Sequence, residues 1–416
     1  MDIVTQLSMF DDTELGDLEK LLLVVSNLPD KELLKALNAR RAKGGAGYSN
    51  ESLWIAFIAK FVFQHPTIES LIRELKRNSQ LRKICGFKPW IDSNGVRHIV
   101  PGSSTFSRFI SRLMEHEELL EEIFEQLVNT MKELLPDFGE TCAIDGKLIN
   151  TYASPFGKSK KKDRRADTQA THTTKIYTSE DGKIVTKKHY YGYRVHLVCD
   201  CKYELPLYYV VSPAHKHEVP VAKDFLFRTE TIDYARMQYF LADKGYDDTD
   251  LIERLEEKDV TVLIPNRHTW RDETTRQYLE TDLIYDQDGK VYYVDDNGKE
   301  HLLRYAGYDK HTDSLRYTFK YKDKNNKVFR IKRKENLRIF PKIARTSMKY
   351  KRIYKKRTAI ERINGRLDRD FLFENHTIRG LSKMKLYVSM SFIISLGFAK
   401  GKILAKDINN LASWVA

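Results

Sequence analysis

Several features that mark other classes of protein are scarce in this 416-residue sequence. Four cysteines are too few for a disulfide scaffold, and none of them has the CxxC spacing of a zinc ribbon. The acidic start of the chain has no apolar core, so we expect no signal peptide. The longest late run without charge, Leu386 to Ala399, is 14 residues long, too short to span a bilayer. We therefore expect a soluble protein of a reducing compartment.

The sequence also lacks a glycine-rich phosphate loop, so nothing in it indicates use of ATP. What it has in excess is positive charge, with 71 Lys and Arg against 58 Asp and Glu and a formal net charge of +13. This balance favours a polyanionic partner such as nucleic acid, although many basic proteins bind none. With 41% hydrophobic residues the chain is typical of globular proteins, and its length allows two or three domains.

The pattern of apolar residues divides the chain into four parts. Residues 1–135 have apolar residues at helical spacing and are predicted to form an all-α domain. Residues 136–265 predict a meander of three strands followed by helix, strand, helix and strand, which is typical of a mixed sheet with flanking helices. Residues 266–345 carry turn signals between alternating stretches and are predicted to form a β-rich insertion. Residues 346–416 return to a helical pattern.

One predicted helix of the first part, Phe106 to Leu113, carries Arg108 and Arg112 on its exposed side. It follows Ser103 and Ser104, either of which is predicted to cap it. Two interpretations fit this segment: the reading helix of a helix-turn-helix, and an ordinary capped helix in a bundle.

A second basic feature is the run KSKKKDRR from Lys158 to Arg165, which has six basic residues and one acid. It has no apolar residues, so we expect a loop. Contact with nucleic acid through Lys158, Lys160, Lys161 and Arg164 is one hypothesis, and a solvated loop is the other.

Two aspartates follow apolar runs in the second part of the chain. Asp145 follows Cys-Ala-Ile and precedes Gly146, and Asp243 follows Phe-Leu-Ala. Each is predicted to end a buried strand, where the sheet holds a side chain firmly. An unpaired carboxylate in such a place is costly unless a cation binds it. Taken singly, either aspartate could instead cap a turn.

A third acid, Glu361, lies in a basic helical stretch, where Tyr354, Arg357, Glu361 and Asp368 fall on one helix face. Three carboxylates suit hard cations such as Mg2+, and two such ions can clamp an in-line phosphoryl displacement. Between residues 341 and 370, eleven Lys and Arg outnumber three acids. Tyr354 and Arg357 are therefore candidate contacts to phosphate. A solvated basic helix with Glu361 in a surface ion pair is the alternative.

Several motifs occur in a set order: Ala-Ile-Asp145-Gly, the run from Tyr191 to Pro213, Leu-Ala-Asp243-Lys-Gly-Tyr246-Asp, and Tyr354-x2-Arg357-x3-Glu361. Together they resemble bacterial insertion-sequence DDE transposases, in particular the insertion-sequence-four-like group with a Tyr-Arg-Glu-Lys signature around the catalytic Glu. The resemblance covers nearly the whole chain. It depends on the order of the motifs, since none of them is distinctive alone.

The resemblance implies an RNase H-like catalytic core with a β-rich insertion before the catalytic Glu. It implies that Asp145, Asp243 and Glu361 bind two Mg2+ or Mn2+ ions and catalyse DNA strand cleavage and strand transfer in cut-and-paste transposition. The implied partner is double-stranded DNA of transposon ends and target, bound by a homodimer in the synaptic complex and with no membrane involved. The helical N-terminal part would bind DNA or dimerise. The implied location is the bacterial cytoplasm, at the nucleoid.

One position departs from this signature, because Asp368 stands where the family has its final Lys. That Lys is associated with phosphate contact, so the role is either lost or passed to Arg362, Arg366 or Arg369. Asp368 would then either repel DNA locally or pair with a neighbouring Arg.

Further residues have weaker assignments. The resemblance implies that an aromatic side chain of the insertion stacks on a flipped base, and Trp270 is the candidate, with packing as its alternative. Arg194 and His196 alternate along one strand near the expected site and are candidate DNA contacts, although His196 also fits a packing role. Glu218 is predicted to cap the helix that follows it.

Two other functions remain open. One is a catalytically inactive, host-adopted DNA-binding protein, against which the presence of all three acids argues. The other is an RNase H-like nuclease that cuts DNA without strand transfer.

Overall fold

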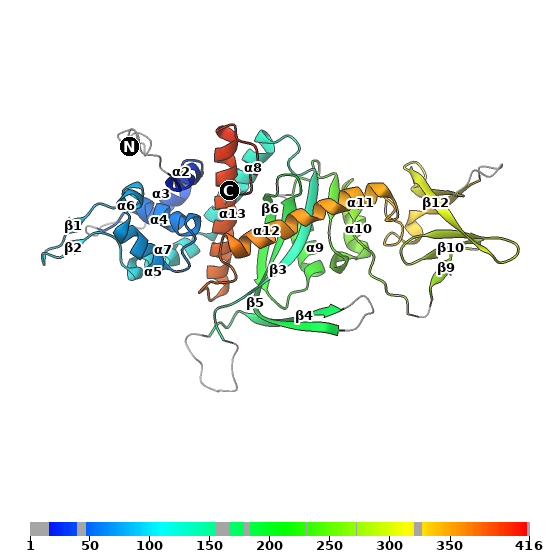
Figure 1. The fold of residues 1–416 in the computed structure, drawn as a ribbon, viewed down its shortest axis with the longest axis horizontal. Coiled ribbons are helices and arrows are strands. Elements are labelled where there is room, and N and C mark those ends of the chain that lie inside the picture. The colour runs from blue at the N-terminus through cyan, green and yellow to red at the C-terminus, as the bar shows by residue number, and fades with distance from the viewer. Residues whose placement is uncertain are drawn as a thin grey trace.

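The structure is a computed structural model. The molecule is elongated, and a group of helices, a mixed sheet and a smaller sheet follow one another along its length (Figure 1). It describes residues 16–39, 47–154, 166–178, 184–228, 232–271, 273–319 and 327–413. The basic run from Lys158 to Arg165, with its candidate contacts Lys158, Lys160, Lys161 and Arg164, lies outside the described residues.

The first region is mostly helical. Ser49 caps α4, and Thr67 and Ser70 form a reciprocal capping box at the start of α5. The elements are α2 (Leu18–Val25), α3 (Lys31–Ala39), α4 (Asn50–Val62), α5 (Ile68–Arg77), α6 (Ser79–Ile84), β1 (Trp90–Ile91), β2 (Arg97–His98), α7 (Ser103–Met114) and α8 (Glu117–Leu134).

The prediction that this region is all-α was wrong in one place, because β1 and β2 form a short antiparallel hairpin. Its turn contains Gly95 with a φ of +77°, a conformation that favours glycine. The Asp92 carboxylate accepts the backbone N–H groups of Asn94 and Val96, and the rings of Trp90 and His98 stack at 4.4 Å. The Asn-Gly pair in the sequence was the available signal for this hairpin.

The predicted cap of α7 was also wrong. Gly102 occupies the N-cap position, and no side chain caps the helix there. Ser103 and Ser104 are instead the first two helical residues.

The second region is a mixed sheet. Its elements are β3 (Thr141–Asn150), β4 (Thr171–Thr178), β5 (Ile184–Asp200), β6 (Pro206–Pro213), α9 (Glu218–Arg228), β7 (Tyr239–Leu241), the 3-10 turn η1 (Lys244–Tyr246), α10 (Thr249–Glu256) and β8 (Thr261–Leu263). The strand order is β4-β5-β3-β7-β8, and β6 pairs with β5. The pairs β4/β5, β5/β6 and β3/β5 are antiparallel, whereas β3/β7 and β7/β8 are parallel.

The insertion begins after β8 and forms a separate six-stranded antiparallel sheet with its own apolar core. Its elements are β9 (Thr275–Gln277), β10 (Leu283–Asp286), β11 (Val291–Val294), β12 (Glu300–Asp309), β13 (Ser314–Phe319), β14 (Val328–Lys332) and η2 (Arg333–Glu335). Arg333, only 1% exposed, ties this sheet to the larger one through the Glu256 carboxylate of α10 at 2.7 Å. The β-rich character expected for this stretch is present.

The chain then returns across the sheet as helix (Figure 1). It forms α11 (Met348–Tyr354), the 3-10 turn η3 (Lys355–Arg357), α12 (Thr358–Arg369) and α13 (Leu381–Leu404). The helical stretch predicted around Glu361 is thus divided into two helices, α11 and α12, with the tighter turn η3 between them. Because side chains alternate along β3, α12 covers the face that carries Asp145 and Lys147, and α9 packs on the other face.

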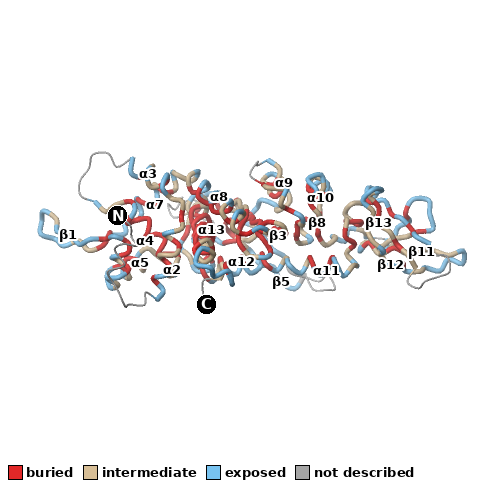
Figure 2. The backbone as a smooth tube through the Cα atoms, turned by 90° about the horizontal axis from the view of Figure 1, so that it is seen from above, coloured by how far each residue is buried: buried red, intermediate tan, exposed pale blue. Residues whose placement is uncertain are grey.

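The apolar core is centred on α13 (Figure 2). By length and composition this helix could cross a membrane, but its most apolar window is 78% buried inside the protein. It packs against α8, α2 and β6, and Gly397 and Gly401 give the close approach to α2, since a Cβ at either would clash with Leu28 or Leu23. One continuous core therefore joins the N-terminal helices to the mixed sheet.

Candidate active site

Asp145 lies in β3, and Asp243 follows the end of β7, the strand that runs parallel to β3 beside it. The pairing of β3 with β7 ends at Ala143 and Leu241, and each aspartate follows its last paired residue by two positions. Parallel strands in register bring such residues to the same end of the sheet. The sequence prediction that these two acids converge is therefore supported by the backbone register.

The prediction that Asp145 ends its strand was wrong. β3 continues to Asn150, because β5 pairs with it along the whole length, and Asp145 lies opposite Leu197 in mid-strand. Only the β7 side of β3 is free beyond Ala143. Asp145 is consequently held by a strand on one side and open on the other.

The two carboxylates also interact electrostatically. Burial, and next the charge of Asp243, raise the pKa of the Asp145 carboxyl, while Arg357 and Lys175 act in the opposite direction. Asp243 caps η1 by accepting the backbone N–H of Gly245 at 2.7 Å. Asp243 therefore both caps η1 and acts electrostatically on Asp145.

The helix α12 meets Asp145 directly. The side-chain amide of Asn364 donates to the Asp145 Oδ2 at 2.9 Å. Glu361 lies three residues earlier on the same helix face, about one turn away. Its carboxylate forms an ion pair with Arg357, and its side chain is 52% exposed. Among the residues that the structure describes, no three His, Cys, Asp or Glu side chains lie close enough together to hold one ion.

The predicted phosphate contacts Tyr354 and Arg357 lie beside this site. Tyr354 stacks on Tyr350 with ring centroids 5.6 Å apart, and the Arg357 guanidinium lies 5.9 Å from the Tyr354 ring. The charges of Asp145, Asp243 and Glu361 all act on Arg357. Arg357 is therefore a cation within electrostatic reach of all three predicted catalytic acids.

Asp368 does not pair with a neighbouring Arg, as one hypothesis had it. Its Oδ2 lies 2.5 Å from the Lys147 ammonium of β3, and both side chains are largely buried. Lys147 is two residues beyond Asp145 on the same face of β3, just as Asp368 is one turn beyond Asn364 on α12. The helix and the strand thus dock through two consecutive polar contacts.

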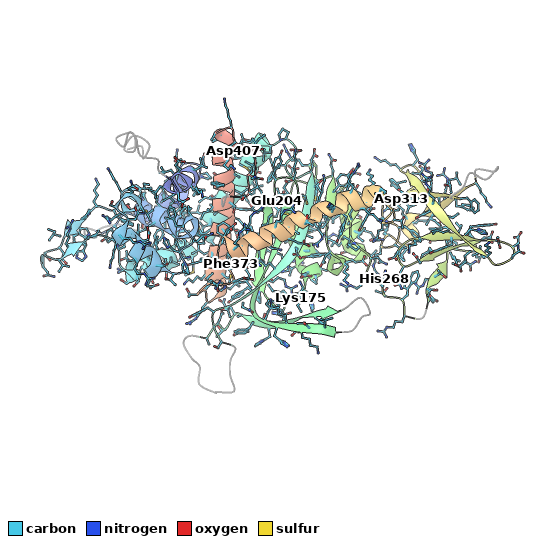
Figure 3. The ribbon with its side chains drawn as sticks, viewed as in Figure 1. Lys175, Glu204, His268, Asp313, Phe373 and Asp407 are labelled. Atoms are coloured by element: carbon cyan, nitrogen blue, oxygen red, sulfur yellow. The ribbon has the colours of Figure 1, made fainter. Side chains whose placement is uncertain are left out.

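The arginines expected to replace the signature Lys are engaged elsewhere. Arg362 and Arg366 both bind the Glu204 carboxylate, which lies beside α12 (Figure 3), and Arg369 binds Asp370. The two ion pairs with Glu204 hold α12 against the turn before β6. A DNA contact by Arg362 or Arg366 stays a prediction and would have to compete with Glu204.

Arg194 and His196 both have largely buried side chains. The Arg194 side chain is 11% exposed and its Nη1 lies 2.9 Å from Glu218. His196 is fully buried and its Nε2 lies 3.1 Å from the Ser212 hydroxyl, and burial lowers the pKa of His196 to about 3. The packing interpretation of His196 fits. A DNA contact through Arg194 stays a prediction and would have to compete with Glu218.

Trp270 packs within the insertion. Its ring is edge-on to Tyr285 at 5.8 Å, and the Arg276 guanidinium lies 4.3 Å from its centroid. This is the packing arrangement that the sequence left open, and base stacking by Trp270 stays a prediction.

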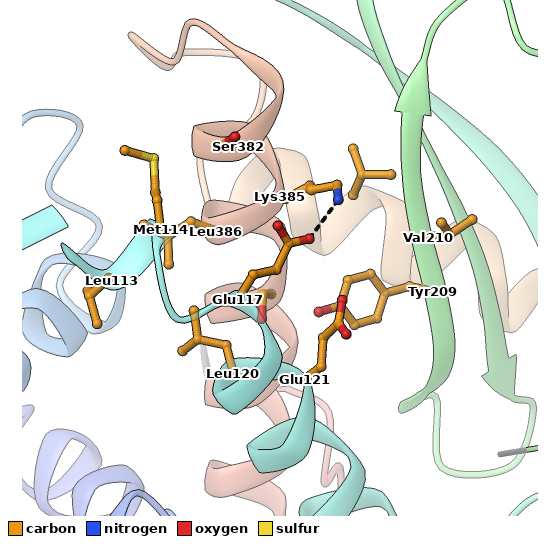
Figure 4. A pocket seen from close by; sticks show the side chains of 12 residues that line it. Leu113, Met114, Glu117, Leu120, Glu121, Tyr209, Val210, Ser382, Lys385 and Leu386 are labelled. Carbon is orange, nitrogen blue, oxygen red and sulfur yellow. Dashed lines mark hydrogen bonds and ion pairs between the residues drawn. The ribbon is translucent and has the colours of Figure 1, made fainter. Parts of the chain in front are cut away.

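A small cavity of about 60 Å³ lies between α8, α13 and β6, and neither Asp145 nor Asp243 lines it (Figure 4). Lys385 and Glu117 form an ion pair of 2.6 Å at its edge, and the rest of its lining is mainly apolar. It is a packing gap with no arrangement of groups for catalysis.

Sequence reasoning missed Asn364 as a partner of Asp145 and misassigned Glu218. Glu218 is the first residue of α9, but its carboxylate is held by Arg194 instead of capping the helix. The spacing of Asn364 from Glu361 was an available signal. Nothing local in the sequence reports the contact of Glu218 with Arg194.

The strand order and the two neighbouring acids define a mixed α/β protein with an acidic site where the parallel pairing of β3 and β7 ends. Residues 136–396 match the transposase DDE domain family, and the chain belongs to that family. No curated protein matches the chain. A solved piggyBac transposase synaptic complex with hairpin DNA is similar at 10% identity over 97% of this chain and 87% of that chain, with a TM-score of 0.33, which is too low to carry any argument.

Proposed function

We propose that this protein cleaves DNA at the ends of a mobile element and joins the released 3′ ends to target DNA. The observation that carries the proposal is the register of β3 and β7, which brings Asp145 and Asp243 to one place in a family defined by such acids. Glu361 is the third acid, one helical turn before the Asn364 that contacts Asp145. The strand order β6-β5-β3-β7-β8 supports an RNase H-like core.

The donor chemistry of the site fits hard divalent cations. Asp145 and Asp243 provide carboxylate oxygens, and the raised pKa of Asp145, caused by burial and then by Asp243, reflects excess negative charge that a cation would relieve. Asp145, Asp243 and Glu361 would hold two Mg2+ or Mn2+ ions. When bound, such ions activate the attacking hydroxyl and stabilise the charge that develops on the leaving oxygen.

The protein's own groups position the substrate. Arg357 offers a planar fork to a phosphate of the DNA backbone, and Tyr354 lies next to it. For Glu361 to act with the two aspartates, its carboxylate must leave Arg357, which frees Arg357 for that phosphate. Asn364 keeps the Asp145 carboxylate in one orientation. In a bacterial cell the substrate would be nucleoid DNA, and two ends would be held by a homodimer.

The test is incubation of purified protein with Mg2+ or Mn2+ and labelled element ends. The proposal predicts specific cleavage at the 3′ ends followed by joined products. Binding without cleavage would contradict it and favour a DNA-binding protein, and cleavage without joining would favour a nuclease.

A further inference from the structure

Glu218 reaches the acidic site from the face of the sheet opposite α12. A Cβ built on Gly146 would lie 2.8 Å from the Glu218 Oε1, and one built on Gly245 would lie 3.2 Å from the Oε2. These two glycines directly follow Asp145 and come two residues after Asp243. The Glu218 carboxylate therefore occupies space that any side chain at either position would fill.

This placement explains why the chain has glycine at two points that need no special backbone angle. Neither Gly146 nor Gly245 has a positive φ, so turn geometry does not require glycine there. At both positions the nearest groups are carboxylates, because Asp243 Oδ1 is 2.8 Å from the Gly245 Cβ position. The missing side chains open a gap through which Glu218 approaches both aspartates.

A buried hydroxyl faces the same group. Tyr246 is fully buried, and within the described part of the chain its hydroxyl has no hydrogen-bond partner. Burial, and then the charges of Glu218, Asp145 and Asp243, raise the pKa of Tyr246, which places its hydroxyl within electrostatic reach of all three acids. A buried hydroxyl without a hydrogen-bond partner favours the binding of a further polar species nearby.

A purely structural role accounts poorly for Glu218. A half-buried carboxylate near two others is destabilised by like charge, and its ion pair with Arg194 at 2.9 Å offsets only part of this. If packing alone were required, a neutral side chain would serve at lower cost. The excess negative charge has a use if divalent cations bind there.

Building on the proposed function, we propose that Glu218 is a fourth acidic side chain of the metal site. Its ion pair with Arg194 positions the carboxylate, and the absence of side chains at Gly146 and Gly245 leaves space for it. Since no three of these acids lie close enough together in the described structure to hold one ion, a bound divalent cation would draw the carboxylates of Glu218, Asp145 and Asp243 together, and Glu361 joins when DNA is engaged.

Mn2+ affinity of the full-length protein without DNA, measured by electron paramagnetic resonance, tests this without any activity readout. Glu218→Gln is expected to weaken binding about tenfold. Asp224→Asn removes the same charge from the same helix, where Asp224 is exposed and pairs with Arg228, and should bind Mn2+ as the unaltered protein does. Equal affinity in Glu218→Gln and Asp224→Asn would overturn the proposal.

Gly146→Ala provides a second route that changes no charge and remains informative if Glu218→Gln fails to fold. Its methyl group should displace the Glu218 carboxylate and weaken Mn2+ binding, but it should weaken binding no further when Glu218→Gln is already present. Full Mn2+ binding by Gly146→Ala, or an equal loss in both backgrounds, would contradict the proposal.

Asp145→Asn distinguishes an error in the role of Glu218 from an error in the metal site itself. If it loses Mn2+ binding while Glu218→Gln keeps it, only the role of Glu218 is wrong. If Asp145→Asn also keeps binding, the metal site itself is wrong, and both proposals fall.

Discussion

The Asn364 amide donates to the Asp145 carboxylate across 219 positions of sequence, joining α12 to the central strand of the sheet. One turn further along, Asp368 meets Lys147 in the same way. These contacts set the position of α12 and, with it, the position of Glu361 relative to the two strand aspartates.

Removing the Asn364 amide should therefore impair catalysis more than folding. Asn364→Leu is expected to reduce the cleavage rate by about tenfold or more, because the Asp145 carboxylate loses the group that orients it. Gly365→Ala is the matched control, since a Cβ at the next residue of α12 meets nothing within 4 Å. That control should keep full activity and raise stability by up to about 1 kcal/mol. Unchanged cleavage by Asn364→Leu would show that Asp145 needs no such support.

Introducing the Lys of the Tyr-Arg-Glu-Lys signature, which the sequence resembles, should harm this protein. Asp368→Lys places a second ammonium against Lys147 in a largely buried position and should cost about 2 kcal/mol in urea unfolding. Combining it with Lys147→Asp should recover part of that loss by restoring an ion pair of reversed polarity. Strictly additive losses in the double variant would mean that the two side chains do not interact.

Acid should destabilise the fold partly through His196. Burial lowers the pKa of His196 to about 3. Below about pH 6.5 the unfolded chain therefore binds a proton at His196 that the folded protein does not bind. Stability is therefore lost as the pH falls from about 6.5 towards 3, at up to about 1.4 kcal/mol per pH unit for this group. His196→Gln should flatten the profile of unfolding free energy against pH. His376, with a pKa lowered to about 4 chiefly by burial, should leave a residual slope. An identical slope in the variant would exclude His196.

The insertion should depend on one buried arginine for its attachment. Arg333 binds Glu256 of α10, Asp313 and the Phe340 carbonyl. Arg333→Met leaves the largely buried Glu256 carboxylate with its longer ion pair to Lys342, at 3.9 Å, and should cost about 3–5 kcal/mol in urea unfolding. Arg330→Met, which breaks a half-exposed pair with Asp309, should cost less than about 1 kcal/mol. Similar losses in both variants would contradict the assigned role of Arg333.

The parts of the site that sequence reasoning located are those with local signals. The apolar runs before Asp145 and Asp243 indicate buried strands. The helical spacing of the residues around Glu361 indicates that they share one face of a helix. The contacts of Asn364, Lys147 and Glu218 depend on which faces of distant elements meet. Lys147 and Asp368 are 221 positions apart, and their pairing follows only from the docking of α12 on β3.

The hairpin and the misplaced helix cap show a related limit. The turn signal Asn94-Gly95 was present, but strands of two residues give almost no alternation to detect. At α7, Gly102 and the serines after it were both plausible starts, and one residue of difference lies within the usual uncertainty of helix ends.

Cleavage of labelled element ends by three variants, Asp145→Asn, Asp243→Asn and Glu361→Gln, tests the central claim most directly. Each substitution removes one carboxylate with little change in shape, so each variant should bind the DNA ends and fail to cut them in Mg2+ or Mn2+. Full cleavage by any one of the three would show that the carboxylate at that position has no part in the catalytic centre.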